Sequence, residues 1–266
     1  MDERISNMDE ARYHALSDWS SGNIRKVLKS WAHVGVESIN PDAARIGRAS
    51  HVRTLEPDTF HRRFVLSPKV DRRTKEGKAL AQAVQEKAER EGLEVLDQAD
   101  FELVESIGQS VAKHPKVGSL LAQAESEVTF RWSELGLKFR CRTDAINDRQ
   151  QVIIDLKTTR DSALDFNRAV MRYDLHIQAY HYLRGVRRFT GKDYDFVFVV
   201  VEKSAPYGVK LYRLSEDYLK VAEKSWFQAI DTIKEREECP DLYPGYSPEI
   251  VTLNPPKFLT QEAYAF

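Results

Sequence analysis

Two aspartates and a lysine in the middle of the chain have the types and spacing needed to hydrolyse a phosphodiester. Asp155 and Lys157 stand two positions apart in the run 152–158, and side chains two apart on a strand project from one face. Asp144 sits near the end of the preceding strand-like run, and the polar residues 147–150 indicate a turn that brings it back beside Asp155. The sequence therefore predicts two carboxylates and an ammonium gathered on one face of a sheet.

Such a cluster supplies what this chemistry requires. Carboxylate oxygens hold hard cations such as Mg²⁺, and the metal activates a bound water and stabilises the charge that builds on the phosphate. Lys157 could orient the attacking water or neutralise the transition state. The ordinary alternative is a solvated strand face, where Asp and Lys are common. The apolar neighbours Ile154 and Leu156, which we expect in the core, favour the catalytic interpretation.

The elements that must position these residues follow from hydrophobic periodicity. Alternation with period two predicts strands at 127–132, 137–146 and 152–158. The second strand should place Leu137, Phe139 and Cys141 on one face and Lys138, Arg140, Arg142 and Asp144 on the other. The apolar run 196–201 is typical of a buried central strand, and 209–214 is its expected partner.

Helical patterns precede and follow these strands. In the first third, Ser20 or Ser21 can cap one helix, Pro41 can open a second that stops before Pro57, and two more cover about 74–91 and 97–113. Further helices are predicted at about 164–188 and 218–237. This order predicts an α/β fold in which helices flank a small mixed β-sheet. We expect a single domain over 1–266, with a helical part over about 1–120, a catalytic sheet core over about 124–214, and a C-terminal helix and tail over 215–266.

Composition excludes several classes of protein. Two separated cysteines, Cys141 and Cys239, exclude a CxxC zinc site and are too few to hold an iron–sulfur cluster. Their scarcity, and a charged start without an apolar signal region, lead us to expect a cytoplasmic protein that does not interact with membranes. The formal net charge is −1, so contact with DNA would depend on local clusters of Arg and Lys.

Three ordered motifs resemble those of the PD-(D/E)XK nuclease superfamily. Asp144 followed by Asp155-Leu156-Lys157 resembles the D…(D/E)XK signature. Gly47–His51 resembles the GxxxH helix motif of the RecB-like and RecE-like branch, and Gln178–Tyr182 resembles its QxxxY motif. The segments 139–144 and 154–159 look most like RecE-type exonucleases, and more distantly like lambda exonuclease. The resemblance spans roughly 20–201, and it implies a restriction-endonuclease-like core.

The resemblance also assigns roles to individual residues. It implies a metal shell built from His51, Asp144, Asp155 and Leu156, with Glu127 as an extra carboxylate. A neutral imidazole can complete such a shell, although a surface histidine is the ordinary alternative. Gln178 and Tyr182, four apart on one helix face, are implied to line the active site with Asp144, Asp155 and Lys157. His176 and His181 match no motif and are interpreted as structural.

Basic and hydroxyl groups near these motifs are candidates for DNA contact. Phosphate contacts give affinity without reading sequence. The backbone N–H groups at a helix start also favour an anion. The candidates are Ser20, Ser21, Arg45, Arg48, Arg140 and Arg142, and a basic loop formed by Arg72, Arg73, Lys75 and Lys78. For many of these cations the alternative is a solvated charge balanced by Asp or Glu.

The resemblance implies a double-stranded DNA exonuclease that uses Mg²⁺, for which Mn²⁺ can substitute. It would digest one strand 5′-to-3′ to mononucleotides and leave 3′ tails for a single-strand annealing protein in recombination. A homo-oligomeric ring, trimeric or tetrameric, would keep a chain of net charge −1 on DNA. Candidate interface residues are Trp226, Phe227, Tyr243, Tyr246 and Phe258, and the alternative for each is burial within one subunit. The alternatives are an endonuclease, a CRISPR-adaptation nuclease, which usually carries four cysteines, and a non-catalytic DNA-binding module.

Overall fold

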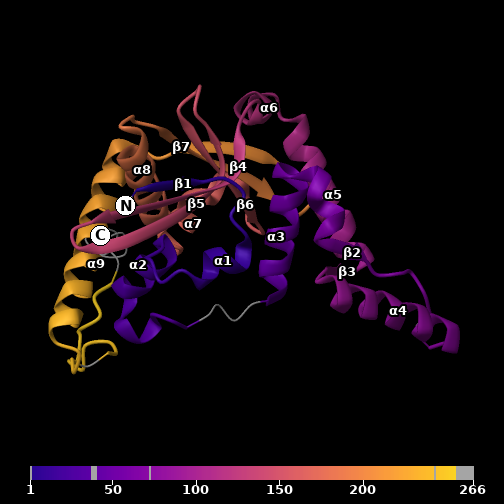
Figure 1. Cartoon of the computed structure of the whole chain (residues 1–266), viewed down its shortest axis with the longest axis horizontal. Coiled ribbons are helices and arrows are strands. Elements are labelled where there is room, and N and C mark those ends of the chain that lie inside the picture. Colours follow the sequence, from indigo (N-terminus) through magenta and orange to yellow (C-terminus); the bar gives the residue numbers. More distant parts are fainter. Residues whose placement is uncertain (1, 37–40, 72, 243, 256–266) are drawn as a thin grey trace, which may run out of the picture.

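A six-stranded mixed sheet forms the centre of the protein (Figure 1). The computed structural model describes residues 2–36, 41–71, 73–242 and 244–255. The strand order is β1-β4-β5-β6-β7-β8, and only β6 and β7 run parallel. The strands are β1 (Glu3–Ile5), β4 (Glu125–Glu134), β5 (Leu137–Asn147), β6 (Val152–Thr159), β7 (Asp195–Glu202) and β8 (Val209–Arg213). The predicted α/β fold with a small mixed sheet is confirmed.

Helices cover both sides of this sheet (Figure 1). One core joins Ile24 of α2 (Ser21–Lys29), Ile177 of α8 (Leu175–Thr190) and Trp226 of α9 (Glu216–Glu238) to the aromatic residues of β4, β5 and β7. A second core joins Ile107 of α5 (Gln98–Lys113) and Val117 of α6 (Pro115–Leu121) to apolar residues of β6 and β7 that include Ile154, Leu156 and Val199. Burial of Ile154 and Leu156, expected from the sequence, is confirmed.

A third, smaller core surrounds α3 (Pro41–Leu55). Ala49 and Val52 of this helix pack with Phe60, Phe64 and Leu96. The last two residues come from a separate parallel pair, β2 (Phe64–Leu66) and β3 (Glu94–Leu96). The remaining helices are α1 (Glu10–Ala15), α4 (Lys75–Glu91) and α7 (Phe166–Arg172), with short 3₁₀ turns at Trp31–His33, Pro57–Arg62 and Ala163–Asp165. Among the described residues, no helix is both long and apolar enough to span a membrane.

The structure differs from the sequence-based expectation mainly near the N-terminus. The first third is not wholly helical, because the three-residue strands β1, β2 and β3 lie within it. Such short strands contain too few alternations to be recognised by periodicity. The helix predicted over 164–188 is instead a 3₁₀ turn, α7 and α8, and it is broken at Asp174, whose φ is +52°.

The apolar residues proposed for a subunit interface have different environments. Trp226 is fully buried inside the subunit, so its assignment to an interface is wrong. Phe227 is partly buried against the same core, and Tyr246 is 65% exposed and packs near His33. Tyr243 and Phe258 lie outside the described residues.

Candidate active site

The two predicted carboxylates, Asp144 and Asp155, lie where the backbone pairing of β5 with β6 ends. Paired residues on these strands run from Asn147↔Val152 to Ala145↔Ile154, and the pairing stops before Asp144 and Asp155. Instead of a backbone pair, Oδ2 of Asp144 accepts a hydrogen bond of 2.7 Å from the Leu156 N–H. The two strands therefore separate at the place where the carboxylates stand side by side, as the turn at 147–150 predicted.

His51 reaches the same place from α3. Its Nδ1 lies 3.4 Å from Oδ2 of Asp144, and its Nε2 lies 2.8 Å from the carbonyl oxygen of Leu156. The imidazole is half-buried, so the alternative of a surface histidine does not hold. An imidazole, a carboxylate and a backbone carbonyl from three elements thus converge.

Asp155 is buried, whereas Lys157 on the same strand face is partly exposed. The Asp155 side chain is 1% exposed. Oδ1 accepts a 2.7 Å hydrogen bond from Nε2 of Gln178, and Oδ2 lies 2.5 Å from Nζ of Lys157. The Lys157 ammonium is therefore the partner of Oδ2, and Gln178 is the partner of Oδ1. Burial raises the pKa of Asp155, and the positive charge of Lys157 opposes this rise.

Glu127 stands opposite Asp144 on β4. The β4–β5 ladder pairs Ser126 with Ala145 and Val128 with Thr143, and the pair between them is interrupted because Glu127 has a φ of +54°. Burial and the neighbouring Asp144 carboxylate raise the pKa of Glu127 to about 7. Nη1 of Arg142 lies 3.5 Å from the Glu127 carboxylate. A third carboxylate is therefore beside the site, as the resemblance implied, but it is paired with an arginine.

These residues fit a divalent cation. Among the described residues, no three His, Cys, Asp or Glu side chains already form a metal-holding group, since Gln178 and Lys157 hold the Asp155 carboxylate. The converging donors are nonetheless of the imidazole and oxygen types that bind divalent metals. The Asp155 carboxylate, paired with Lys157, is a further oxygen donor nearby. His51, Asp144, Asp155 and the carbonyl of Leu156 would hold the ion.

Helix α8 supplies residues that contact or pack behind the carboxylates of the site. Gln178 is 7% exposed and contacts Asp155 directly. The ring of Tyr182, one turn later, packs edge-on against Phe196, and burial raises the pKa of its hydroxyl well above the ordinary value. His181 between them is fully buried: its Nε2 contacts the Arg140 carbonyl at 2.9 Å, and its Nδ1 accepts from Trp226. The structural role predicted for His181 is confirmed.

A groove leads from these residues to the surface between α1 and α3. It is lined by Glu10, Tyr13, His14, Gly47, Arg48, His51, Val52, Arg63, Glu127, Arg142 and Tyr182. Glu10, Tyr13, His14 and Arg63 were missed by the sequence analysis. We call the side of the groove formed by α1 its wall. Asp9 caps α1 by accepting from the Arg12 N–H. An aspartate before a helix was the one local signal in the sequence that could have predicted this helix.

Two of the arginines proposed for DNA contact hold this wall in place. Arg142 donates to the Met8 carbonyl at 2.8 Å and lies 4.3 Å from the centre of the Tyr13 ring. Arg140 donates to the Leu16 carbonyl and also lies over Tyr13. Arg140 is 8% exposed, so its assignment to DNA contact is wrong for this conformation, because α1 covers it. Arg142 lines the groove and remains a candidate.

The other two arginines form ion pairs between elements. Arg48 binds both oxygens of Glu94 at 3.0 and 2.6 Å, and it also lines the groove. Arg45 lies 2.7 Å from Asp100 of α5. Such pairs connect residues about 50 positions apart, so they could not be read from local spacing. Their contact with DNA stays a prediction.

The proposed phosphate site at Ser20 and Ser21 is not supported. The Ser20 hydroxyl accepts from the Asn23 N–H and donates to the Asn23 side chain, and the Ser20 N–H donates to the same side chain. Ser21 is buried. The donors of Ser20 are thus used to cap α2. Arg25, one turn along this helix and missed by the sequence analysis, donates a 2.8 Å hydrogen bond to the Tyr173 carbonyl and lies near Asp155 and Tyr182.

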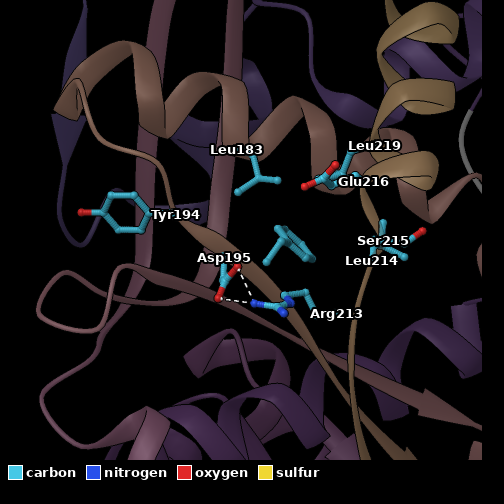
Figure 2. A pocket seen from close by; sticks show the side chains of 9 residues that line it. Leu183, Tyr194, Asp195, Arg213, Leu214, Ser215, Glu216 and Leu219 are labelled. Carbon is cyan, nitrogen blue, oxygen red and sulfur yellow. Dashed lines mark hydrogen bonds and ion pairs between the residues drawn. The ribbon is translucent and has the colours of Figure 1, made fainter.

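A separate pocket lies away from this groove (Figure 2). It is bounded by α8, the start of β7, the end of β8 and the first turn of α9, and it contains an ion pair of 2.9 Å between Asp195 and Arg213. Its lining residues are Leu183, Tyr194, Asp195, Phe196, Arg213, Leu214, Ser215, Glu216 and Leu219. None of the residues predicted for catalysis or metal binding lines it.

Comparison with known proteins assigns the chain to a family. The chain belongs to the family described as a PDDEXK-like domain of unknown function (DUF3799), whose sequence profile matches residues 21–242. No curated protein matches the chain. A crystal structure from Eubacterium rectale, described as "Putative exonuclease", has the same fold: it is 13% identical, with a TM-score of 0.62, over 98% of this chain and 100% of that one. A second structure, SSO0001, is 19% identical over 55% of this chain and 70% of that one, with a TM-score of 0.28 that is too low for an argument.

Proposed function

We propose that this PDDEXK-like protein is a divalent-metal-dependent nuclease that degrades double-stranded DNA from an end. The observation that carries the proposal is the convergence of His51, Asp144 and the Leu156 carbonyl beside the buried Asp155 and its partner Lys157. The sequence motifs and the family both agree with a nuclease. We propose Mg²⁺ as the cellular ion, with Mn²⁺ as a substitute.

The residues around the site have separable tasks. A bound cation would activate water and stabilise negative charge on the phosphate. The Lys157 ammonium lies next to Asp155. From there it can donate a hydrogen bond to the attacking water or to a phosphate oxygen. Gln178 fixes the orientation of the Asp155 carboxylate. Tyr182 lines the groove as a neutral phenol that can donate to the DNA backbone.

The manner of attack on DNA is proposed from the RecE-like motifs. We propose 5′-to-3′ digestion to mononucleotides in the cytoplasm, leaving 3′ tails for a single-strand annealing protein in recombination, by a ring of three or four subunits. The exonuclease description of the Eubacterium rectale protein, whose fold is similar, agrees with end-dependent cleavage. Arg48, Arg63 and Arg142 line the groove and are candidates for contact with the phosphates of the substrate.

The test uses linear duplex DNA labelled at either end and incubated with the protein and Mg²⁺. Release of the 5′ label as mononucleotide ahead of the 3′ label supports the proposal, and EDTA should abolish it. Covalently closed circular duplex is the control, because an enzyme that needs an end must spare it. Nicking of the circle would favour an endonuclease. Binding of duplex without cleavage under either metal would favour a non-catalytic module.

A further inference from the structure

Helix α4 projects from the body of the protein as an arm (Figure 1). We use the name arm for residues 69–71 and 73–92, which comprise α4, the residues before it and its C-cap; Arg72 lies outside the described residues. Only Gly77 and Ala88 of the 17 residues of α4 are buried, and Leu80 is 55% exposed. A helix with so little of its surface packed contributes little to the core, so its length calls for another explanation.

The base of the arm lies at the rim of the groove. Gly92 ends α4 in the left-handed conformation, with a φ of +67°. It lines the outer part of the groove together with Glu56, Arg63 and Glu127. The ion pair between Arg48 and Glu94 then fastens the following strand, β3, to α3. At about 1.5 Å per residue, a helix of 17 residues carries its far end about 25 Å from this rim.

At the far end, hydrogen bonds connect Asp71, Arg73, Thr74 and Gly77. The Thr74 hydroxyl donates to the Asp71 carbonyl and accepts from the Gly77 N–H, and the Asp71 carboxylate accepts from the Arg73 N–H. A Cβ at Gly77 would collide with the Asp71 carbonyl oxygen. The turn is therefore built around a glycine, and it holds Arg73 at a defined position in front of the first helical turn.

Charge is distributed unevenly along the arm. Residues 69–78 contain five Lys or Arg and two Asp or Glu, in a chain of net charge −1. Arg73, Lys75 and Lys78 are exposed, and no carboxylate among the described residues forms a salt bridge with them. Near the base, by contrast, Glu91 lies 3.9 Å from Lys87 and 3.5 Å from Arg90. The N-terminal end of α4 adds partial positive charge to the cations at the tip.

We propose that the tip of the arm binds the phosphate backbone of duplex DNA outside the catalytic groove. The inference rests on the proposed function, since it takes duplex DNA as the substrate. Duplex DNA carries one charge per about 1.7 Å of its axis, so a tip about 25 Å from the rim would meet phosphates about seven base pairs beyond the groove. Such a contact would guide the undegraded duplex toward the groove without reading its sequence.

The experiment compares the triple variant Arg73→Gln, Lys75→Gln, Lys78→Gln with the unchanged protein. Fluorescence anisotropy in EDTA measures the binding of a 30-base-pair duplex over a range of salt concentrations, so the readout does not depend on cleavage. We expect affinity to fall about tenfold near 0.1 M salt, and the slope of log affinity against log salt to flatten by about 2 to 3. Cleavage of short duplex with Mg²⁺, assayed separately, tests the proposed function itself.

Two controls isolate the tip. Lys87→Gln with Arg90→Gln removes the same type of charge from the base of the helix, and it should leave the salt slope unchanged. A duplex of six base pairs, too short to fill the groove and reach the tip together, should bind the triple variant and the unchanged protein equally. Gly77→Ala, which displaces the turn without changing charge, should reproduce part of the loss.

Three outcomes would overturn the proposal. One is an unchanged salt slope with the long duplex. Another is an equal loss for long and short duplexes, which would place the effect in the groove. The third is a change in molecular mass by light scattering together with unchanged DNA affinity, which would make the tip a contact between subunits.

Discussion

The imidazole of His51 bridges Asp144 and Leu156: its Nδ1 lies 3.4 Å from the carboxylate and its Nε2 lies 2.8 Å from the carbonyl oxygen. Both partners accept hydrogen bonds, and a neutral imidazole has a single N–H, so it can satisfy only one of them. A divalent cation held by all three groups would replace both contacts. This bridge marks the position where we expect the cation to bind.

Replacing His51 by Ala is expected to weaken Mn²⁺ binding by at least about tenfold, because the variant loses a nitrogen ligand. Isothermal titration calorimetry measures the affinity. His14→Ala is the matched control, since His14 lines the same groove from α1 and has no contact with Asp144. Equal affinity in the two variants would remove His51 from the metal shell.

Asp144→Asn and Asp155→Asn are each expected to lower the rate of duplex cleavage by at least about a hundredfold. Both substitutions keep the shape of the side chain, which matters at Asp155 because that side chain is buried. Cleavage is measured with end-labelled linear duplex after thermal melting has established that the variants fold. Asp148→Asn, which changes a carboxylate in the turn of the same hairpin and not in the site, should keep full activity. Cleavage by the Asp144 variant at the normal rate would contradict the assignment.

Lys157→Met should retain metal binding but lose turnover. The substitution removes the ammonium that stabilises charge in the reaction, and none of the groups expected to hold the cation is changed. It also leaves the buried Asp155 carboxylate without its cation, so the free energy of unfolding should fall by about 3 kcal/mol. Calorimetry with Mn²⁺, single-turnover cleavage and chemical denaturation separate these effects. Loss of metal affinity would mean that Lys157 organises the metal site instead.

The buried His181 should make stability depend on pH. Burial, which removes water from the charged form, lowers its pKa from the ordinary 6.5 to about 4. A protonated ring also could not accept from Trp226 at Nδ1. As pH falls, the unfolded chain takes up the proton first. The contribution is therefore fully present above about pH 6.5 and is lost progressively toward pH 4, by on the order of 3 kcal/mol.

Denaturation at several pH values tests this contribution. In His181→Gln the pH dependence of unfolding between pH 4 and 6.5 should be flatter than in the unchanged protein, even though overall stability is lower. The exposed His14 provides the comparison: His14→Gln should keep the original profile. An identical slope in His181→Gln and the unchanged protein would assign the pH dependence to other groups.

Two glycine substitutions should have opposite effects on stability. A Cβ at Gly185 of α8 would lie 2.5 Å from Cζ3 of the fully buried Trp132, so Gly185→Ala should destabilise by about 1–3 kcal/mol. Gly118 of α6 is exposed and has open space around it. Gly118→Ala should stabilise by about 0.5–1 kcal/mol, because alanine is the better helix former. Thermal unfolding compares them directly, and a neutral Gly185→Ala would contradict the close contact of α8 with β4.

Local pattern was sufficient to predict the strands that carry the carboxylates. Asp155 and Lys157 lie two apart on one strand, and the turn at 147–150 determines which residue of the preceding strand faces them. Hydrophobic periodicity and turn residues are properties of short segments, so they can be recognised from the sequence alone. The fold class and the placement of Asp144 beside Asp155 followed from them.

The surroundings of the site depend on contacts between distant residues. The burial of Asp155 depends on Gln178 of α8, and the covering of Arg140 depends on Tyr13 and Leu16, more than 120 positions earlier. An arginine beside a predicted active site looks the same in sequence whether it faces DNA or a carbonyl of its own chain. For this reason Arg140, which α1 covers, was assigned wrongly, the phosphate site proposed at Ser20 is not supported, and the wall formed by α1 was missed.

That wall has a consequence for how the protein is made. Tyr13 is synthesised early, but Arg142, against which it packs, follows 129 residues later in the numbering. At 5–20 residues per second, the delay is on the order of 10 s. During translation, the first helix must therefore wait without its final partners until β4 and β5 have left the ribosome. The groove is complete only when more than half of the chain exists, so a nascent chain interrupted before that point carries no assembled candidate site.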